Sequence, residues 1–170
     1  MTNAPFDLSG KVALVTGGNG GIGLGMAEAM ARAGANVAIG GTNAEKNAAA
    51  KARLDALDVD AEAFQCTVAD EADVDRTMQA TLDRFGRLDG CFANAGVTGR
   101  GAKSFLDITA EEWRRVLSVN LDGTFFTFKA ALRHMVSRAE TGDPGGRLVA
   151  VSSLASVSGP ARNEHYAASK

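Results

Sequence analysis

The chain has 170 residues, of which 45% are hydrophobic and 22% charged, and its formal net charge at pH 7 is −2. This length suits one globular domain with a substantial buried core, and the composition is ordinary for such a domain. The near-neutral charge gives no electrostatic basis for binding nucleic acid or an anionic membrane surface, so neither is an expected partner.

The location expected from the sequence is the cytoplasm. The first eleven residues, MTNAPFDLSGK, contain no apolar signal-peptide core, and no apolar run approaches the length of a membrane span. Cys66 and Cys91 each lie in an apolar stretch without a CxxC partner or a nearby histidine. They are expected to be buried free thiols in a reducing compartment, and neither predicts a metal site.

Short apolar runs alternate along the chain with stretches of helical periodicity. Strands are predicted at residues 11–18, 36–41, 61–68, 88–96 and 147–153. Helices are predicted at 22–33, 44–57, from an Asp70 N-cap to Phe85, from Thr109 to about Arg138, and around 166–170. Thr109 and Glu112 fit a capping box at the start of the long helix. Residues 97–108 are predicted to form a loop. The alternation predicts the α/β class, with a doubly wound parallel sheet forming one domain over residues 1–170.

A glycine-rich turn, TGGNGGIG at residues 16–23, lies between the first strand and the first helix. Gly17, Gly21 and Gly23 follow the spacing Gly-x3-Gly-x-Gly. At this place in a doubly wound sheet, backbone N–H groups and a helix N-terminus can bind a pyrophosphate. A Cβ would block the approach of the phosphate, or of the helix to the strand. A glycine-rich turn also occurs as a purely structural feature, so other motifs must decide.

The last five residues, YAASK, place Tyr166 and Lys170 four positions apart, on one face of a helix. A free phenol has a pKa of about 10, and a nearby ammonium favours the phenolate. Such a pair can exchange a proton with an alcohol or carbonyl oxygen while hydride moves to or from a nicotinamide. A Tyr–Lys pair on a helix is more often a packed surface pair when no other motif accompanies it.

Together these motifs resemble the short-chain dehydrogenase/reductase family. The TGxxxGxG turn, NAG at 94–96, SVN ending at Asn120, VSS ending at Ser153, and Tyr166-x3-Lys170 occur in the family's order. The resemblance spans essentially the whole chain, although Ala93 replaces the first Asn of the family's NNAG and Thr67 replaces its usual Asp. It implies a Rossmann fold that lacks its last strands here, because the family's chains generally continue beyond this lysine.

The resemblance also implies roles for individual residues. Tyr166 would be the catalytic acid/base, and Lys170 would tune it and bond the nicotinamide ribose. Ser153 would hold the substrate oxygen, with Ser152 as a close competitor, and Asn120 would hold a water that links Lys170 to solvent. Besides Tyr166 and Lys170, the residues expected to contact the cofactor are Gly17, Asn19, Gly21, Ile22, Gly23, Thr42, Val68, Asn94, Ala95 and Gly96.

The end of the second strand should distinguish NAD from NADP, because an acidic residue there binds the ribose 2′-hydroxyl of NAD. The chain has Gly41 and Thr42 at this point, so no carboxylate would repel a 2′-phosphate and no arginine would attract one. Thr42, Asn43 and Lys46 could supply neutral or basic contacts. These residues favour NADP over NAD by a small margin.

The sequence therefore predicts an NAD(P)-dependent oxidoreductase that transfers hydride between a nicotinamide cofactor and a small alcohol or carbonyl substrate. The alternative is a catalytically silent nucleotide-binding module or an inactive fragment, since the 170 residues end at the catalytic helix. A methyltransferase on a similar sheet would explain the glycine turn but would give Tyr166 and Lys170 no role. The resemblance further implies a homo-oligomer, a dimer or tetramer, formed through the long helix.

Overall fold

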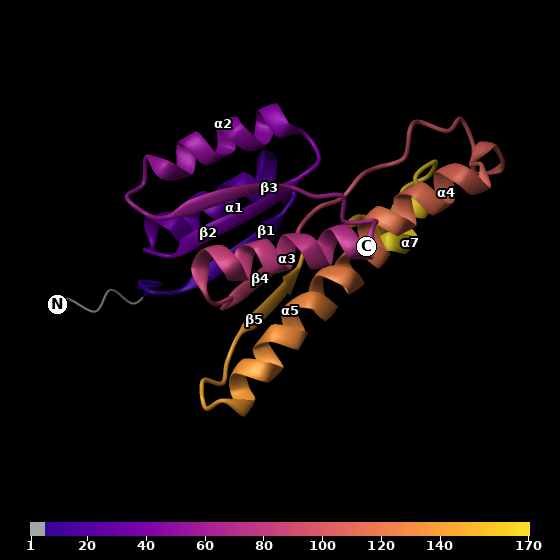
Figure 1. Ribbon diagram of the computed structural model, residues 1–170. Coiled ribbons are helices and arrows are strands. Elements are labelled where there is room, and N and C mark those ends of the chain that lie inside the picture. The colour runs from indigo at the N-terminus through magenta and orange to yellow at the C-terminus, as the bar shows by residue number, and fades with distance from the viewer. Residues whose placement is uncertain (1–5) are drawn as a thin grey trace.

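A five-stranded parallel sheet forms the centre of the computed structural model, which describes residues 6–170 (Figure 1). Its strand order is β3-β2-β1-β4-β5, and each neighbouring pair is parallel. The strands are β1 (Val12–Thr16), β2 (Asn36–Gly41), β3 (Ala61–Gln65), β4 (Gly90–Ala93) and β5 (Arg147–Ala150). The predicted doubly wound parallel sheet is confirmed. The predicted bounds of β1, β3, β4 and β5 were too long, because the residues after each of these strands leave the sheet at its carboxyl edge, and β1 and β4 also begin later than predicted.

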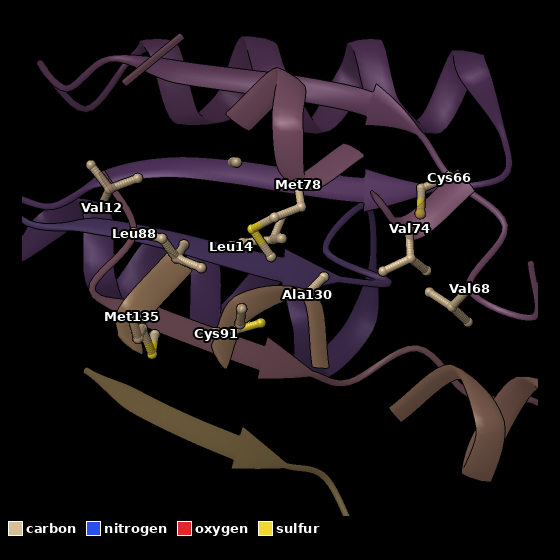
Figure 2. Close-up of a cluster of buried hydrophobic side chains, with 12 residues drawn as sticks. Val12, Leu14, Cys66, Val68, Val74, Met78, Leu88, Cys91, Ala130 and Met135 are labelled. Carbon is tan, nitrogen blue, oxygen red and sulfur yellow. The ribbon is translucent and has the colours of Figure 1, made fainter. Parts of the chain in front are cut away.

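Helices cover both faces of the sheet, as the alternating pattern predicted. Helices α1 (Gly21–Arg32) and α2 (Ala44–Asp55) pack on one face through a cluster that includes Leu24, Ile39 and Leu54. Helices α3 (Glu71–Phe85) and α5 (Gly123–Glu140) pack on the other face. Figure 2 shows the cluster on this second face, where Leu14 and Met78 meet between the sheet and the helices.

The long helix predicted from Thr109 is one continuous rod, but it is not α-helical throughout. It consists of α4 (Ala110–Leu117), a π-helical turn η2 (Ser118–Asp122) and α5. Of the capping box predicted at its start, one hydrogen bond forms and the reciprocal one does not. The Thr109 hydroxyl accepts from the Glu112 backbone N at 3.1 Å, but the Glu112 carboxylate binds Arg115 and the backbone N of Arg100 instead of reaching back.

Three shorter helices complete the chain. A 3-10 turn η1 (Phe105–Asp107) lies in the segment predicted as loop, and α6 (Ala155–Ser158) follows β5. The last helix, α7 (Glu164–Ser169), packs against α4 (Figure 1), and it also contacts α6. Strand β5 is an edge strand of the sheet and is largely exposed.

The prediction that Asp70 caps α3 is confirmed, because the Asp70 carboxylate accepts from the backbone N of Ala72 at 2.9 Å.

Both cysteines are buried free thiols, as predicted. Burial raises the pKa of Cys91 to about 12 and also raises the pKa of Cys66. Over residues 6–170, no helix combines the length and the apolar character that crossing a membrane requires. The expectation that the chain starts without a signal peptide falls partly on residues 1–5, which lie outside the described residues.

Candidate active site

A cleft of about 580 Å³ lies at the carboxyl edge of the sheet. Its walls are the segments that follow β1, β2, β3 and β4, so it spans the point between β1 and β4 where the strand order reverses. Open parallel sheets bind ligands at this point. The cleft brings together ten residues that were predicted to contact a cofactor: Gly17, Asn19, Gly21, Ile22, Gly23, Thr42, Val68, Asn94, Ala95 and Gly96. Its other lining residues, which were not among the predicted contacts, are Gly20, Gly40, Gly41, Cys66, Thr67, Val97 and Val119.

The glycine turn packs closely against the end of β4. A Cβ on Gly23 would overlap the Gly17 carbonyl and the Asn94 amide, so glycine is required there for close packing. Gly21 has φ +51°, which favours glycine, and a Cβ at Gly20 or Gly21 would meet no atom within 4 Å. The outer side of the turn is therefore open, and no side chain caps the start of α1 at Gly20. This arrangement fits a pyrophosphate against the first turn of α1.

Asn94 ties the ends of the first and fourth strands together. Its side-chain nitrogen donates to the carbonyl oxygens of Thr16 at 3.0 Å and Gly17 at 3.2 Å. The Thr16 hydroxyl in turn accepts from the backbone N of Asn94 at 3.2 Å. The floor of the cleft is thus held by side chains on both strands.

Asn47 supports the far end of the cleft, although the sequence did not single it out. It is buried on α2 and donates to the Gly41 carbonyl at 2.8 Å and to the Phe64 carbonyl at 3.0 Å. Its oxygen accepts from Asn19 at 2.7 Å. The only sequence signal was a polar residue on the buried face of an alanine-rich helix.

The cleft has no charged lining residue within the described part of the chain. Of the residues proposed to contact the adenosine ribose, Thr42 lines the cleft, whereas Asn43 caps α2 by accepting from the Lys46 backbone N at 2.8 Å. Lys46 is not among the cleft residues. Thr67, which replaces the family's usual aspartate, donates its backbone N to Asp73 at 2.8 Å.

Lys170, Gly96 and Asn120 converge at the end of β4. A Cβ on Gly96 would lie 3.1 Å from Lys170 Nζ and 3.3 Å from Asn120 Oδ1. The Lys170 ammonium donates to the Val151 carbonyl at 2.9 Å, and burial lowers its pKa below the ordinary value. A half-buried cation therefore sits at the edge of the cleft.

Asn120 is fully engaged by protein groups in the π-helical turn. Its oxygen accepts from the Val97 backbone N at 2.8 Å, and its nitrogen donates to the Val97 carbonyl at 3.0 Å and to the Ser169 hydroxyl at 2.8 Å. The side chain thus joins the segment after β4 to helix α7. This structural role differs from the expected water relay, which stays a prediction.

The two serines after β5 are placed differently. Ser153 is half-buried, and its hydroxyl accepts from the Ala155 backbone N at 3.2 Å, so it caps the loop after β5, and its expected contact with the substrate oxygen stays a prediction. Ser152 is exposed and donates to the Lys170 carbonyl at 2.8 Å.

Tyr166 is half-buried on α7, one helical turn before Lys170. Within residues 6–170, no group of three or more potential ligands could hold a metal ion.

Comparisons with known proteins identify the family of the chain. Residues 11–170 match the family model described as short chain dehydrogenase. The chain is 35% identical to 2,5-dichloro-2,5-cyclohexadiene-1,4-diol dehydrogenase of Sphingobium indicum, over 96% of this chain and 62% of that relative. It is 36% identical to NADP-dependent (R)-specific alcohol dehydrogenase of Lentilactobacillus kefiri, again over 96% and 62%. The chain therefore spans about 62% of the length of these relatives.

Solved structures show the same fold. A crystal structure of NAD+-bound xylitol dehydrogenase has a TM-score of 0.89 and 35% identity, over 95% of this chain and 60% of that one. A 3-ketoacyl-(acyl-carrier-protein) reductase from Brucella melitensis, complexed with NADH, has a TM-score of 0.88 and 28% identity, over 96% and 65%. The sheet and its covering helices are therefore a Rossmann fold.

Proposed function

Because the chain belongs to the short-chain dehydrogenase/reductase family, we propose that the protein transfers hydride between a nicotinamide cofactor and a small alcohol or carbonyl substrate. The observation that carries this proposal is the meeting of Lys170, Gly96 and Asn120 at the edge of the cleft. Three motifs that are far apart in the sequence thereby adjoin the predicted cofactor site. We propose that residues 1–170 form one NAD(P)-binding domain.

Each part of the cleft has a proposed partner on the cofactor. The Gly17–Gly23 turn and the start of α1 would bind the pyrophosphate, because five of the seven turn residues are glycine and leave their backbone N–H groups uncovered by a side chain of their own. Gly41 and Thr42 would lie at the adenosine ribose, and Gly96 and Lys170 at the nicotinamide ribose. When bound, the nicotinamide would supply or accept the hydride.

Tyr166 is proposed to move the proton. In reduction its phenol donates a proton to the carbonyl oxygen as hydride reaches the carbonyl carbon, and in oxidation the same oxygen returns the proton. Lys170 keeps a positive charge on the same helix face, which favours the phenolate that this exchange forms. Ser153 would hold the substrate oxygen by a hydrogen bond.

We propose that the protein has a slight preference for NADP over NAD. The support is the absence of charge among the cleft's described lining residues, since no carboxylate would repel the 2′-phosphate. One relative is NADP-dependent by name, whereas one solved structure holds NAD+, so relatives support either cofactor. Titration of protein fluorescence with NADPH and with NADH tests this proposal, and tighter binding of NADH would contradict it.

A homo-oligomer in the cytoplasm is also proposed. The long helix exposes Leu121, Phe125, Leu132 and Val136, which is an unusual amount of apolar surface for a free helix face. A second copy of the chain would cover it. Light scattering of the intact protein should give a mass at least twice that of one chain, and a monomer would contradict this.

The experiment that tests the function is turnover of a panel of ketones and alcohols by the intact protein. We expect oxidation of NADPH with at least one ketone. Cofactor binding without turnover across the panel would favour the alternative, a nucleotide-binding module that does no chemistry.

A further inference from the structure

The segment that continues from the cleft floor, Val97–Arg100, is held by side chains from two different helical elements. From the α4–η2 rod, Asn120 binds both backbone groups of Val97, and Arg115 donates to the Thr98 carbonyl at 2.8 Å. From the residue that precedes α7, the Asn163 oxygen accepts from the Gly99 backbone N at 3.0 Å. The segment therefore bridges the long helix and the helix that carries Tyr166.

Glu112 anchors the bridge on the α4 side. Its carboxylate accepts from Arg115 at 2.7 and 2.8 Å and from the Arg100 backbone N at 2.9 Å. The hydrogen bond from Arg115 lowers the pKa of Glu112 to about 2, so the carboxylate stays ionised at neutral pH. A bidentate pair of this kind fixes geometry as well as charge.

On the α7 side, the His165 ring packs against the Val97–Arg100 segment. Its side chain is 1% exposed, and both ring nitrogens are buried without a hydrogen-bond partner in residues 6–170. Its Nε2 lies 3.8 Å from Glu112 Oε1, and a Cβ on Gly99 would overlap the ring. The ring thus occupies the space that any side chain at position 99 would need, directly beside Tyr166 in the chain.

We propose that the contact of Gly99 with His165, backed by Glu112, positions the helix that carries Tyr166 relative to the cofactor cleft. The contact connects the cleft to the proposed acid/base. The segment Val97–Arg100 begins next to Gly96 in the cleft, and its Gly99 packs on His165, the residue before Tyr166. His165 and Glu112 are positioning residues, since they act through Tyr166 and do not line the cleft. The inference rests on the proposed function.

A double-mutant cycle tests the contact. Gly99 does not have a left-handed φ, so Gly99→Ala adds a Cβ against the His165 ring, and 2.8 Å from the Asn163 side-chain oxygen, without backbone strain. We expect the kcat for ketone reduction to fall at least about tenfold, since small displacements of reacting groups cost large factors in rate. The Kd for NADPH should change by less than about twofold, because residue 99 lies outside the cleft. In a His165→Ala background the same substitution should cost less, since the ring is gone and only the Asn163 side-chain oxygen, 2.8 Å from the added Cβ, remains close to it.

The matched control is Gly25→Ala, because Gly25 is exposed on α1 and a Cβ there meets no atom within 4 Å. If Gly99→Ala fails to fold, Glu112→Gln, with Glu111→Gln as its control, should lower kcat and leave the Kd for NADPH unchanged. Three results would overturn the positioning role alone. They are an unchanged kcat in the Gly99→Ala variant of an active protein, an equal loss of kcat with and without His165→Ala, and a loss of NADPH affinity that matches the loss of kcat. An unmutated protein that binds cofactor without turnover would overturn the proposed function as well.

Discussion

Replacing Asn94 with alanine should loosen both the fold and the cleft. The side chain donates two hydrogen bonds to backbone carbonyls, those of Thr16 and Gly17, and both join the end of β1 to the end of β4. Each intramolecular hydrogen bond contributes about 0.5–1.5 kcal/mol net, so the variant should lose about 1–3 kcal/mol of unfolding free energy. Urea unfolding measures this as a lower midpoint at an unchanged slope.

The same variant should bind NADPH more weakly, because the Gly17 carbonyl that Asn94 holds belongs to the turn at the cleft. Asn36→Ala is the matched control. It removes one exposed hydrogen bond from the Asp60 backbone N at the opposite edge of the sheet, so it should leave NADPH binding unchanged. A stability loss below about 0.5 kcal/mol in Asn94→Ala, the size of an ordinary surface substitution, would refute this reasoning.

Three further predictions concern other sites. Gly23→Ala should weaken cofactor binding and lower the unfolding midpoint, because the added Cβ would overlap the Gly17 carbonyl; calorimetric titration that gives an unchanged Kd would contradict this. Glu112 has a folded pKa lowered to about 2, so its contribution to stability is present above its ordinary pKa and lost as pH falls toward 2. The difference in unfolding free energy between the unmutated protein and Glu112→Gln should therefore shrink on acidification, and a constant difference would count against it. Cys91, buried with a pKa raised to about 12, should resist iodoacetamide until the protein is unfolded, as mass spectrometry would detect.

The sequence predicted those features that depend on local periodicity and turn chemistry. The apolar runs marked all five strands, and the glycine spacing placed the turn at the cleft correctly. The Asp70 cap followed from a local side-chain preference. These features are decided within a few residues of one another.

Features that depend on distant partners were missed. The π-helical turn at Asn120 is accompanied by hydrogen bonds to Val97, which no local pattern indicates. The second half of the capping box failed because Arg115 and Arg100 bind the Glu112 carboxylate. The close approach of Gly99 to His165 likewise exists only in the folded chain.

Tyr166 is the residue proposed to exchange the proton during hydride transfer. The most direct test of this role is the kcat of Tyr166→Phe in the intact protein with an active ketone, measured beside the Kd for NADPH. We expect kcat to fall by about 10²–10⁴, the usual contribution of general acid–base catalysis, while the cofactor still binds. A Tyr166→Phe variant that turns over at the rate of the unmutated protein would contradict this role of Tyr166.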